Sequence, residues 1–216
     1  MNYYPIFLNL QGRRCVVIGG GVIAEGKVRG LLDAEAAIIV IAPELTSRLR
    51  TWVAEGRVGH LTRAYQPGDL AGAFLAISAT DDREVNARVW EEATARNLPV
   101  NVVDDTPHCN FIAPSILRRG DLTVAISTSG KAPALAVRLR EQLEQLVGDE
   151  HARFLELAGT LREPLAQRYP SFEQRKALWY RLVDSDVLAL LKRGDEATAR
   201  HRMTEIMGVK PMEAGG

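Results

Sequence analysis

The stretch Cys15-Val-Val-Ile-Gly-Gly-Gly-Val-Ile-Ala24 decides the fold of this chain. Its first four residues form a short, apolar run rich in β-branched side chains, which is typical of a strand buried on both faces. The three glycines predict a tight turn, and Val22 to Ala34 has the composition and apolar spacing of a helix. A second apolar run, Ala37 to Ile41, predicts another buried strand, so the stretch indicates a β-α-β unit.

Strands and helices continue to alternate up to about residue 105. Elements that alternate at this spacing are typical of a parallel sheet covered by helices on both faces. We therefore predict a Rossmann-type α/β domain over residues 1–112. Its further expected elements are helices over 45–54 and 82–97 and strands over 58–61, 73–78 and 100–103.

The pattern changes after Asp105. We predict a small α+β region over 113–148 and a helical C-terminal domain over 149–216, whose last residues, 210–216, are expected to be disordered. The observations behind this division are a short apolar segment over 111–117 broken by Pro114, a strand pattern over 122–127, a helical pattern over 133–147, and only helical spacing from 149 onward with breaks near Pro170 and Gly194.

Composition limits the classes of function. The chain has 216 residues with 27 basic and 27 acidic side chains, so its net charge gives no indication of nucleic acid or of an anionic membrane as partner. The two cysteines, Cys15 and Cys109, form no disulfide framework, and this usage fits a reduced cytoplasmic setting. The first residues do not have the pattern of a signal peptide, and no apolar run approaches the roughly 20 residues that a membrane helix needs.

The glycine turn fits a dinucleotide site. Gly19, Gly21 and Ala24 match the pattern G-x-G-x-x-A: the first glycine permits the tight turn, the second lets a pyrophosphate approach the backbone, and the alanine lets helix and sheet pack closely. The N-terminus of the helix then offers free N–H groups to the phosphates. The alternative is a glycine-rich turn without a ligand, but the motif lies between a buried strand and a helix, as a dinucleotide site requires.

Two further strand ends belong to the expected cofactor site. The second strand ends in Ala42-Pro43-Glu44 instead of directly in an acidic residue, and because Glu44 would repel a 2′-phosphate we expect NAD rather than NADP. After the fourth strand, Thr80 and Asp81 are expected to border the cofactor, although Asp81 or Asp82 can equally cap the next helix. The candidate cofactor-binding residues are Gly19, Gly21, Val22, Ile23, Ala42, Pro43, Glu44, Thr80 and Asp81.

Asp104 is the candidate catalytic residue. It follows the fifth strand at the carboxyl edge of the sheet, and a carboxylate there can act as a base beside a nicotinamide. The alternative is an ordinary turn aspartate, since Asp105-Thr106-Pro107 has turn composition. Asp105 is the substitute candidate.

Histidines and cysteines do not predict a permanent metal site. His108 and Cys109 are adjacent and rarely would both face one ion, and the other histidines, His60, His151 and His201, are scattered. His108 either lines a substrate pocket or is an exposed loop residue. In the C-terminal part, core packing is the favoured role for the aromatic residues over covering a flat ligand; they are Phe154, Phe172, Trp179 and Tyr180.

Five motifs in order resemble the precorrin-2 dehydrogenase family, whose members also form the N-terminal half of bacterial sirohaem synthases. They are GRRCVVIGGGVIAEGKV, SATDDREVN, NVVDD, CNFIAPSI and ISTSGKAPALA. The resemblance implies NAD-dependent oxidation of precorrin-2 to sirohydrochlorin, and in many members insertion of ferrous iron to give sirohaem. It also implies that Asp104, in the N-V-V-D motif, is catalytic. A homodimer with 113–148 as its dimerisation region follows from it too, and the methyltransferase domain of the longer synthases is expected to be a separate protein.

The implied substrate carries eight carboxylates, which directs attention to the turn Ser127-Thr128-Ser129-Gly130-Lys131. This turn precedes a helix, and its hydroxyl groups, N–H groups and lysine suit a carboxylate, although an ordinary helix cap explains them equally well. With Asp105 and His108, these five residues are the candidate substrate-binding set. Further positive charge comes from Arg118, Arg119, Arg138 and Arg140, most of which are expected to be solvated surface.

Three functions remain in view. The leading one is the dehydrogenase, with or without iron insertion. A regulatory NAD-sensing dimer is the alternative from another class, and it has no need of a carboxylate at Asp104. A dehydrogenase for some small substrate is the third, and it would not need several basic residues around one opening.

Overall fold

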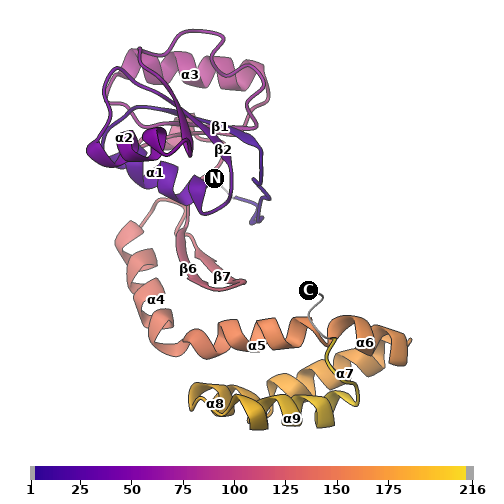
Figure 1. Ribbon diagram of the computed structural model, residues 1–216. Helices are drawn as coiled ribbons and strands as arrows, with labels where there is room; N and C mark the ends of the chain where they lie inside the picture. The colour runs from indigo at the N-terminus through magenta and orange to yellow at the C-terminus, as the bar shows by residue number, and fades with distance from the viewer. Residues whose placement is uncertain (1–2, 213–216) are drawn as a thin grey trace. The chain divides into compact units, whose positions relative to one another are not determined.

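The chain folds into two compact units, Met1–Ala113 and Pro114–Gly216, in a computed structural model that describes residues 3–212 (Figure 1). Of the tail expected to be disordered, residues 213–216 lie outside the described range. None of the helices in the described range combines the length and the hydrophobicity that a membrane crossing requires.

The first unit is built on a five-stranded parallel sheet with the strand order β3-β2-β1-β4-β5. This is the order of the first five strands of a Rossmann fold, so the predicted fold class is confirmed. The central strand β1 pairs with β2 and β4, and the register aligns Ile18 with both Ile41 and Ser78, so these strands end together. The strands are β1 (Arg14–Ile18), β2 (Ala37–Ile41), β3 (Val58–Leu61), β4 (Leu75–Ser78) and β5 (Val100–Val102).

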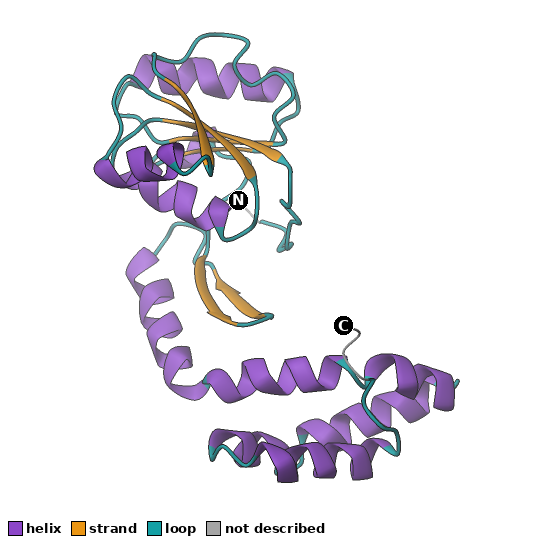
Figure 2. Ribbon diagram, viewed as in Figure 1, coloured by secondary structure: helices purple, strands orange, loops and turns teal. Residues whose placement is uncertain are grey.

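Helices cover both faces of this sheet (Figure 2). Alternate residues of β1 face opposite sides, because successive side chains of a strand point to opposite faces. Cys15 and Val17 pack with the helices α1 (Val22–Leu32) and α2 (Ser47–Ala54), whereas Val16 and Ile18 pack with α3 (Arg83–Ala95). The side chains of β1 are therefore buried on both faces of the sheet, as the apolar sequence of this strand predicts.

No helix connects β3 to β4; residues 62–74 form a loop that lies over the α3 face instead. Tyr65 and Leu70 from this loop are buried in the core that α3 also covers. A connection without a helix leaves backbone N–H groups that need partners, because an unpaired buried amide is costly.

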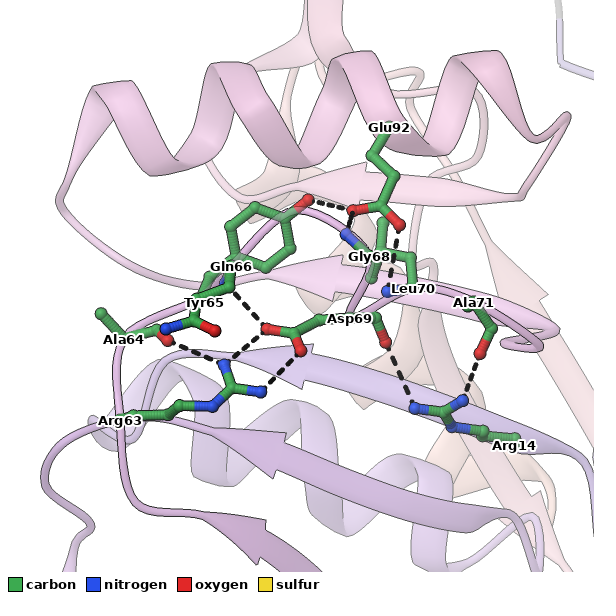
Figure 3. A network of polar contacts seen from close by, with 10 residues as sticks. All are labelled: Arg14, Arg63, Ala64, Tyr65, Gln66, Gly68, Asp69, Leu70, Ala71 and Glu92. Atoms are coloured by element: carbon green, nitrogen blue, oxygen red, sulfur yellow. Dashed lines mark hydrogen bonds and ion pairs between the residues drawn. The ribbon is translucent and has the colours of Figure 1, made fainter.

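Polar side chains supply those partners (Figure 3). The carboxylate of Glu92 on α3 accepts hydrogen bonds from the Tyr65 hydroxyl, from the Gly68 amide at 2.9 Å and from the Leu70 amide at 3.3 Å, and it pairs with Arg96 at 2.9 Å. Burial alone would raise the pKa of Glu92, but these hydrogen bonds lower it below its usual value. Burial, reinforced by the hydrogen bond to Glu92, raises the pKa of Tyr65.

A second carboxylate fixes the other part of the loop (Figure 3). Arg63 binds Asp69 through two nitrogens at 2.7 and 2.8 Å, and Asp69 also accepts from the Gln66 amide at 2.8 Å. The hydrogen bonds from Arg63 lower the pKa of Asp69. Arg14 of β1 donates to the carbonyl oxygens of Asp69 and Ala71, which ties the loop to the sheet.

The second unit begins with a β-hairpin of β6 (Ser115–Arg119) and β7 (Leu122–Ile126) and continues as helices. Gly120 makes the hairpin turn with a φ of 55°, a conformation that suits glycine. The later helices share one core that includes Leu161, Leu165, Leu182 and Met203. The helices are α4 (Pro133–Leu146), α5 (Asp149–Gly159), α6 (Arg162–Arg168), α7 (Phe172–Val183), α8 (Val187–Lys192) and α9 (Glu196–Met207).

The aromatic residues of the second unit are divided between core and surface. Phe154 is buried and Trp179 packs against the same core, as expected. Core packing was the wrong expectation for Phe172 and Tyr180, which are 66% and 62% exposed. The reason is their place on α7: Tyr180 is two positions from the buried Leu182 and so lies on nearly the opposite side of the helix, and Phe172 is the first residue of the helix.

Helix α4 also leaves apolar side chains exposed. Its spacing predicts an apolar face, but Ala136 is its one buried residue among those described. Leu135, Leu139 and Leu146 are exposed within the chain, Leu146 by 70%. An apolar stripe that finds no partner within its own chain is typical of a surface that packs against another molecule.

Candidate active site

The loops that follow β1, β2, β4 and β5 all leave the sheet at one edge. The strands are parallel, and the register pairs Ile18 with Ile41, Ile18 with Ser78, and Ser78 with Val102. Ligands of such sheets bind outside the carboxyl ends of the strands. The candidate residues of the first unit, which are far apart in sequence, therefore share one edge of the sheet.

Two glycines in the β1 turn are required by the packing of the protein itself. Gly19 has a φ of 114°, and a β-carbon there would overlap the Ala79 carbonyl. A β-carbon on Gly20 would overlap the Glu44 carbonyl, and the Thr46 amide donates to the Gly20 oxygen at 2.9 Å. The sequence motif missed Gly20, because the dinucleotide pattern leaves that position open.

Gly21 is different, because a β-carbon at this position would meet no protein atom within 4 Å. It is the N-cap of α1 and has no side-chain cap, so the amides of the first helical turn are left for another partner. Val22 and Ile23 in this turn are exposed, whereas Ala24 is fully buried against the sheet. Open space over a glycine and unpaired N–H groups at a helix start fit a dinucleotide pyrophosphate.

The loop after β2 places Glu44 at the surface. Ala42 is buried, Pro43 and Glu44 are exposed, and the Glu44 carboxylate has no hydrogen-bond partner within residues 3–212. This free carboxylate at the end of the second strand can accept hydrogen bonds from ribose hydroxyls. Thr46, which sequence reasoning missed, caps α2 and donates to Glu25 of α1 at 2.7 Å, which fixes the loop against the first helix.

The loop after β4 is fixed by its own polar contacts. Asp82 accepts from the Glu84 and Val85 amides, so the helix-cap alternative is confirmed for Asp82, while Asp81 remains exposed. Asn86 of α3, a residue that sequence reasoning missed, accepts from the buried Ser78 hydroxyl at 2.6 Å and donates to the Thr80 carbonyl at 3.1 Å. The backbone at Thr80 is therefore held in place beside Gly19.

The loop after β5 turns back on its strand. Asn101 forms an antiparallel bridge with Cys109, and its side chain donates to the Phe111 carbonyl at 3.1 Å. The buried Cys109 thiol donates to the Val102 carbonyl at 3.1 Å. Burial raises the pKa of Cys109, and it raises that of the core residue Cys15 to about 11, so both are poor nucleophiles. The bridge closes residues 102–108 into a short excursion from the sheet.

Asp104 lies in that excursion with an exposed side chain. Its φ is 60°, and its carboxylate has no hydrogen bond or ion pair within the described part of the chain. Within residues 3–212, four non-glycine residues have a positive φ: Glu35 and Asn97 end helical turns, and Asp104 and Ser129 lie in the two loops predicted to be functional. Aspartate tolerates this conformation better than most residues, and such strain clusters at functional sites.

Asp105 and His108 form a pair in the same excursion. The Asp105 Oδ2 atom lies 2.7 Å from Nδ1 of His108. The imidazole also meets the Trp90 ring edge-on, with ring centres 5.4 Å apart. His108 is therefore oriented by two neighbours and is not a free loop side chain.

The candidate turn of the second unit, Ser127–Lys131, uses two of its hydroxyls on its own backbone. Ser127 Oγ accepts from the Ser129 amide at 3.0 Å, and Thr128 Oγ1 accepts from the Ala132 amide at 3.2 Å. Lys131 is exposed and makes no ion pair within residues 3–212. Of the additional basic residues, Arg138 pairs with Glu141 at 2.7 Å, Arg140 with Glu144, and Arg119 approaches Asp149 at 3.9 Å.

Histidine, cysteine and acidic side chains do not gather as metal ligands: the described residues contain no group of three or more that could hold an ion. Both ring nitrogens of His60 have a nearby partner: Nε2 lies 2.9 Å from the Ala42 carbonyl oxygen, and Nδ1 lies 3.3 Å from Thr62 Oγ1. His201 pairs with Glu205 on the surface of α9 at 3.3 Å.

Three families match consecutive parts of the chain. Residues 6–115 match the family described as putative NAD(P)-binding, and residues 119–146 match the central region of sirohaem biosynthesis proteins. Residues 150–207 match the sirohaem synthase dimerisation region. The name of that last family refers to the helical part, whereas the resemblance in sequence implied dimerisation through 113–148.

Individual relatives agree with these families. The chain is 43% identical over 207 residues to a sirohaem synthase of Methylobacillus flagellatus, covering 96% of this chain and 44% of the relative. It is 42% identical over 217 residues to sirohaem synthase 3 of Aeromonas hydrophila, covering 100% and 46%. The chain thus spans less than half the length of these curated relatives. Among solved structures it is similar to SirC, a precorrin-2 dehydrogenase, with a TM-score of 0.77 and 27% identity, covering 94% of this chain and 100% of that one.

Proposed function

The chain belongs to the family of precorrin-2 dehydrogenases and of the matching region of sirohaem synthases, and from this premise we propose that it oxidises precorrin-2 to sirohydrochlorin with NAD as the hydride acceptor. We further propose that it inserts ferrous iron into the product. The two buried, unpaired cysteines are consistent with a reducing, cytoplasmic setting.

The N-terminal unit would hold the dinucleotide at the carboxyl edge of its sheet. The first-turn amides after Gly21 would bind the pyrophosphate, and Glu44 would accept from the ribose hydroxyls and disfavour a 2′-phosphate. Val22, Ile23, Ala42, Pro43, Thr80 and Asp81 would complete the lining. When bound, the nicotinamide supplies a hydride acceptor, and the chain's task is to orient the substrate and to take up the proton.

Asp104 carries the proposal. It is an exposed carboxylate that has no partner within residues 3–212, and it lies at a positive φ after β5, at the edge of the sheet where the nicotinamide would bind. A carboxylate with no partner of its own is free to accept the proton that oxidation releases. A sensor without catalytic activity gives no reason to keep such a group in a strained backbone conformation.

The substrate and the dimer contact would both involve the second unit. The hydroxyl, amide and ammonium groups of Ser127–Lys131 would bind substrate carboxylates, with Lys131 supplying a charge that no carboxylate of the described residues neutralises. The exposed apolar side chains of α4 and the match to a dimerisation region support a homodimer.

The test is anaerobic oxidation of enzymatically made precorrin-2 by the parent chain and by Asp104→Asn. Asparagine tolerates a positive φ, so the variant is expected to fold and to bind NAD like the parent. We expect the parent to form NADH and sirohydrochlorin together, and the variant to lose about 100-fold or more in kcat, the usual contribution of a general base. NAD binding without oxidation by the parent would refute the enzyme and favour the NAD-sensing dimer.

A further inference from the structure

The Asp105–His108 pair has the geometry of an oriented base. Asp105 is the residue at which the short 3-10 turn Thr106–His108 begins, yet its side chain does not cap that turn. Instead its carboxylate meets Nδ1 of His108 at 2.7 Å. An ionised carboxylate only accepts hydrogen bonds, so Nδ1 carries a proton, and in the neutral imidazole Nε2 then presents its lone pair.

The Nε2 atom is available. It has no hydrogen-bond partner among residues 3–212, and the His108 side chain is 43% exposed. Trp90 restricts the ring plane from the α3 side, so Nε2 is directed by contacts on two sides. A carboxylate that holds an imidazole by Nδ1 keeps it in the correct tautomer and stabilises the imidazolium that forms when Nε2 takes a proton.

The two reactions of the proposed function differ in how many protons they release. Oxidation of precorrin-2 transfers one hydride to NAD and releases one proton. Insertion of Fe²⁺ forms bonds from the metal to the ring nitrogens, and two pyrrole N–H bonds break, so two protons leave without any change in oxidation state. Asp104 can hold one proton at a time, and a second acceptor is needed when both are removed together.

We propose that His108 is this second acceptor: Nε2 takes one of the two pyrrole protons during iron insertion while Asp104 takes the other, and Asp105 is a positioning residue that acts through His108. The proposal rests on the proposed function. It is carried by the 2.7 Å pair, by the contact with Trp90, and by the place of His108 four residues after Asp104 in an excursion closed by the Asn101–Cys109 bridge.

The test compares the two reactions in His108→Gln. Insertion is followed with preformed sirohydrochlorin and Fe²⁺ under anaerobic conditions, without NAD, against a protein-free control; oxidation is followed separately with precorrin-2 and NAD. We expect His108→Gln to slow insertion by about tenfold or more and to slow oxidation by a clearly smaller factor, since oxidation uses His108 only in substrate binding. Free imidazole should restore part of the insertion rate in His108→Ala. His201→Gln is the matched control, because it removes another carboxylate-paired histidine, on the surface of α9, and it should behave as the parent.

The role of Asp105 is tested in the same assay. Asp105→Asn should slow insertion in the parent background and should cost nothing further in His108→Gln, because the two residues act as a unit. Equal loss of both reactions in His108→Gln without rescue by imidazole would show a structural role and overturn the proposal, as would unchanged insertion. A parent that inserts iron no faster than the protein-free control also overturns it. Failure of the proposed oxidation is a separate result, seen in the assay with precorrin-2.

Discussion

The α-carbon of Gly20 lies against the carbonyl oxygen of Glu44, so closely that a β-carbon at position 20 would overlap that oxygen. This contact joins the turn after β1 to the loop after β2, and the hydrogen bond from the Thr46 amide to the Gly20 oxygen closes it at 2.9 Å. The two loops that are proposed to hold the dinucleotide are thus packed together. Gly20 and Gly21 in the first of these loops have different roles.

Alanine substitutions should separate those roles. Gly20→Ala must displace the Glu44 backbone, so we expect a lower melting temperature and loss of NAD binding together. Gly21→Ala meets no protein atom within 4 Å, so its melting temperature should equal that of the parent while the Kd for NAD rises by about tenfold or more, because the methyl group occupies the space of the pyrophosphate. Calorimetric unfolding and NAD titration measure both. Unchanged NAD affinity in Gly21→Ala would place the cofactor elsewhere.

Glu44 should set the preference for NAD over NADP. Its exposed carboxylate has no partner within residues 3–212, so its removal leaves the fold intact. In Glu44→Ala we expect the Kd for NAD to rise by about tenfold, the worth of a hydrogen bond to a charged group, and the Kd for NADP to stay equal or fall. Titration with both dinucleotides gives the ratio. Glu55→Gln at the far end of α2 is the control, and an unchanged ratio in Glu44→Ala would assign selectivity to another residue.

Glu92 should contribute to stability in a pH-dependent way. Its carboxylate accepts four hydrogen bonds, whereas the amide of Glu92→Gln has a single oxygen and turns an NH₂ group toward donors, so we expect a loss of about 2 kcal/mol in the free energy of unfolding at pH 7. The pKa of Glu92 is lowered in the folded state. Its contribution is therefore complete above the unfolded pKa of about 4.3 and is lost as the pH falls through the lower, folded pKa.

Urea unfolding of parent and Glu92→Gln across pH 3 to 7 measures this difference. The two curves of unfolding free energy should converge toward the acid end. A difference that stays constant over the whole range would mean that the charge of Glu92 does not matter. Glu55→Gln, which breaks an exposed pair with Arg57 at 3.5 Å, should change stability very little at any pH.

The exposed apolar face of α4 should form the dimer contact. Leu135 and Leu139 are one helical turn apart, and both are exposed within the chain. The double substitution Leu135→Glu, Leu139→Glu should halve the molar mass in light scattering while the circular dichroism spectrum stays that of the parent. The comparison variant is Phe172→Glu, Tyr180→Glu on α7. If only this second variant dissociates, the contact lies in the helices of residues 150–207 instead.

Most of the fold could be predicted because its signals are local. The apolar runs at Cys15–Ile18 and Ala37–Ile41 and the glycine turn between them fixed the β-α-β unit, and the observed elements begin and end within a few residues of those expected. The loop over residues 62–74 could not be predicted in the same way. Its structure depends on Glu92 and Arg14, which are distant in sequence and carry no pattern that links them to it.

The same division holds for the candidate site. Asp104 follows a predicted strand and could be named from the sequence, because the end of a parallel strand has a known place in the fold. Three other features could not be predicted, because each depends on which groups meet when the loops come together. They are the pairing of Asp105 with His108, the support from Asn86 and the need for glycine at position 20. The expected core positions of Phe172 and Tyr180 were wrong for a related reason, because hydrophobicity alone does not show which face of a helix the core will cover.

By itself, the sequence determined the Rossmann sheet, the glycine turn and the order of the motifs, because periodicity and turn chemistry act between residues near one another in the chain. Only the tertiary structure decided that Gly20 is held by Glu44, that Asp104 lies at a positive φ with no partner for its carboxylate within residues 3–212, and that His108 is oriented by Asp105 and Trp90. These relationships arise when separate loops are brought to one edge of the sheet, and that proximity is a property of the folded chain.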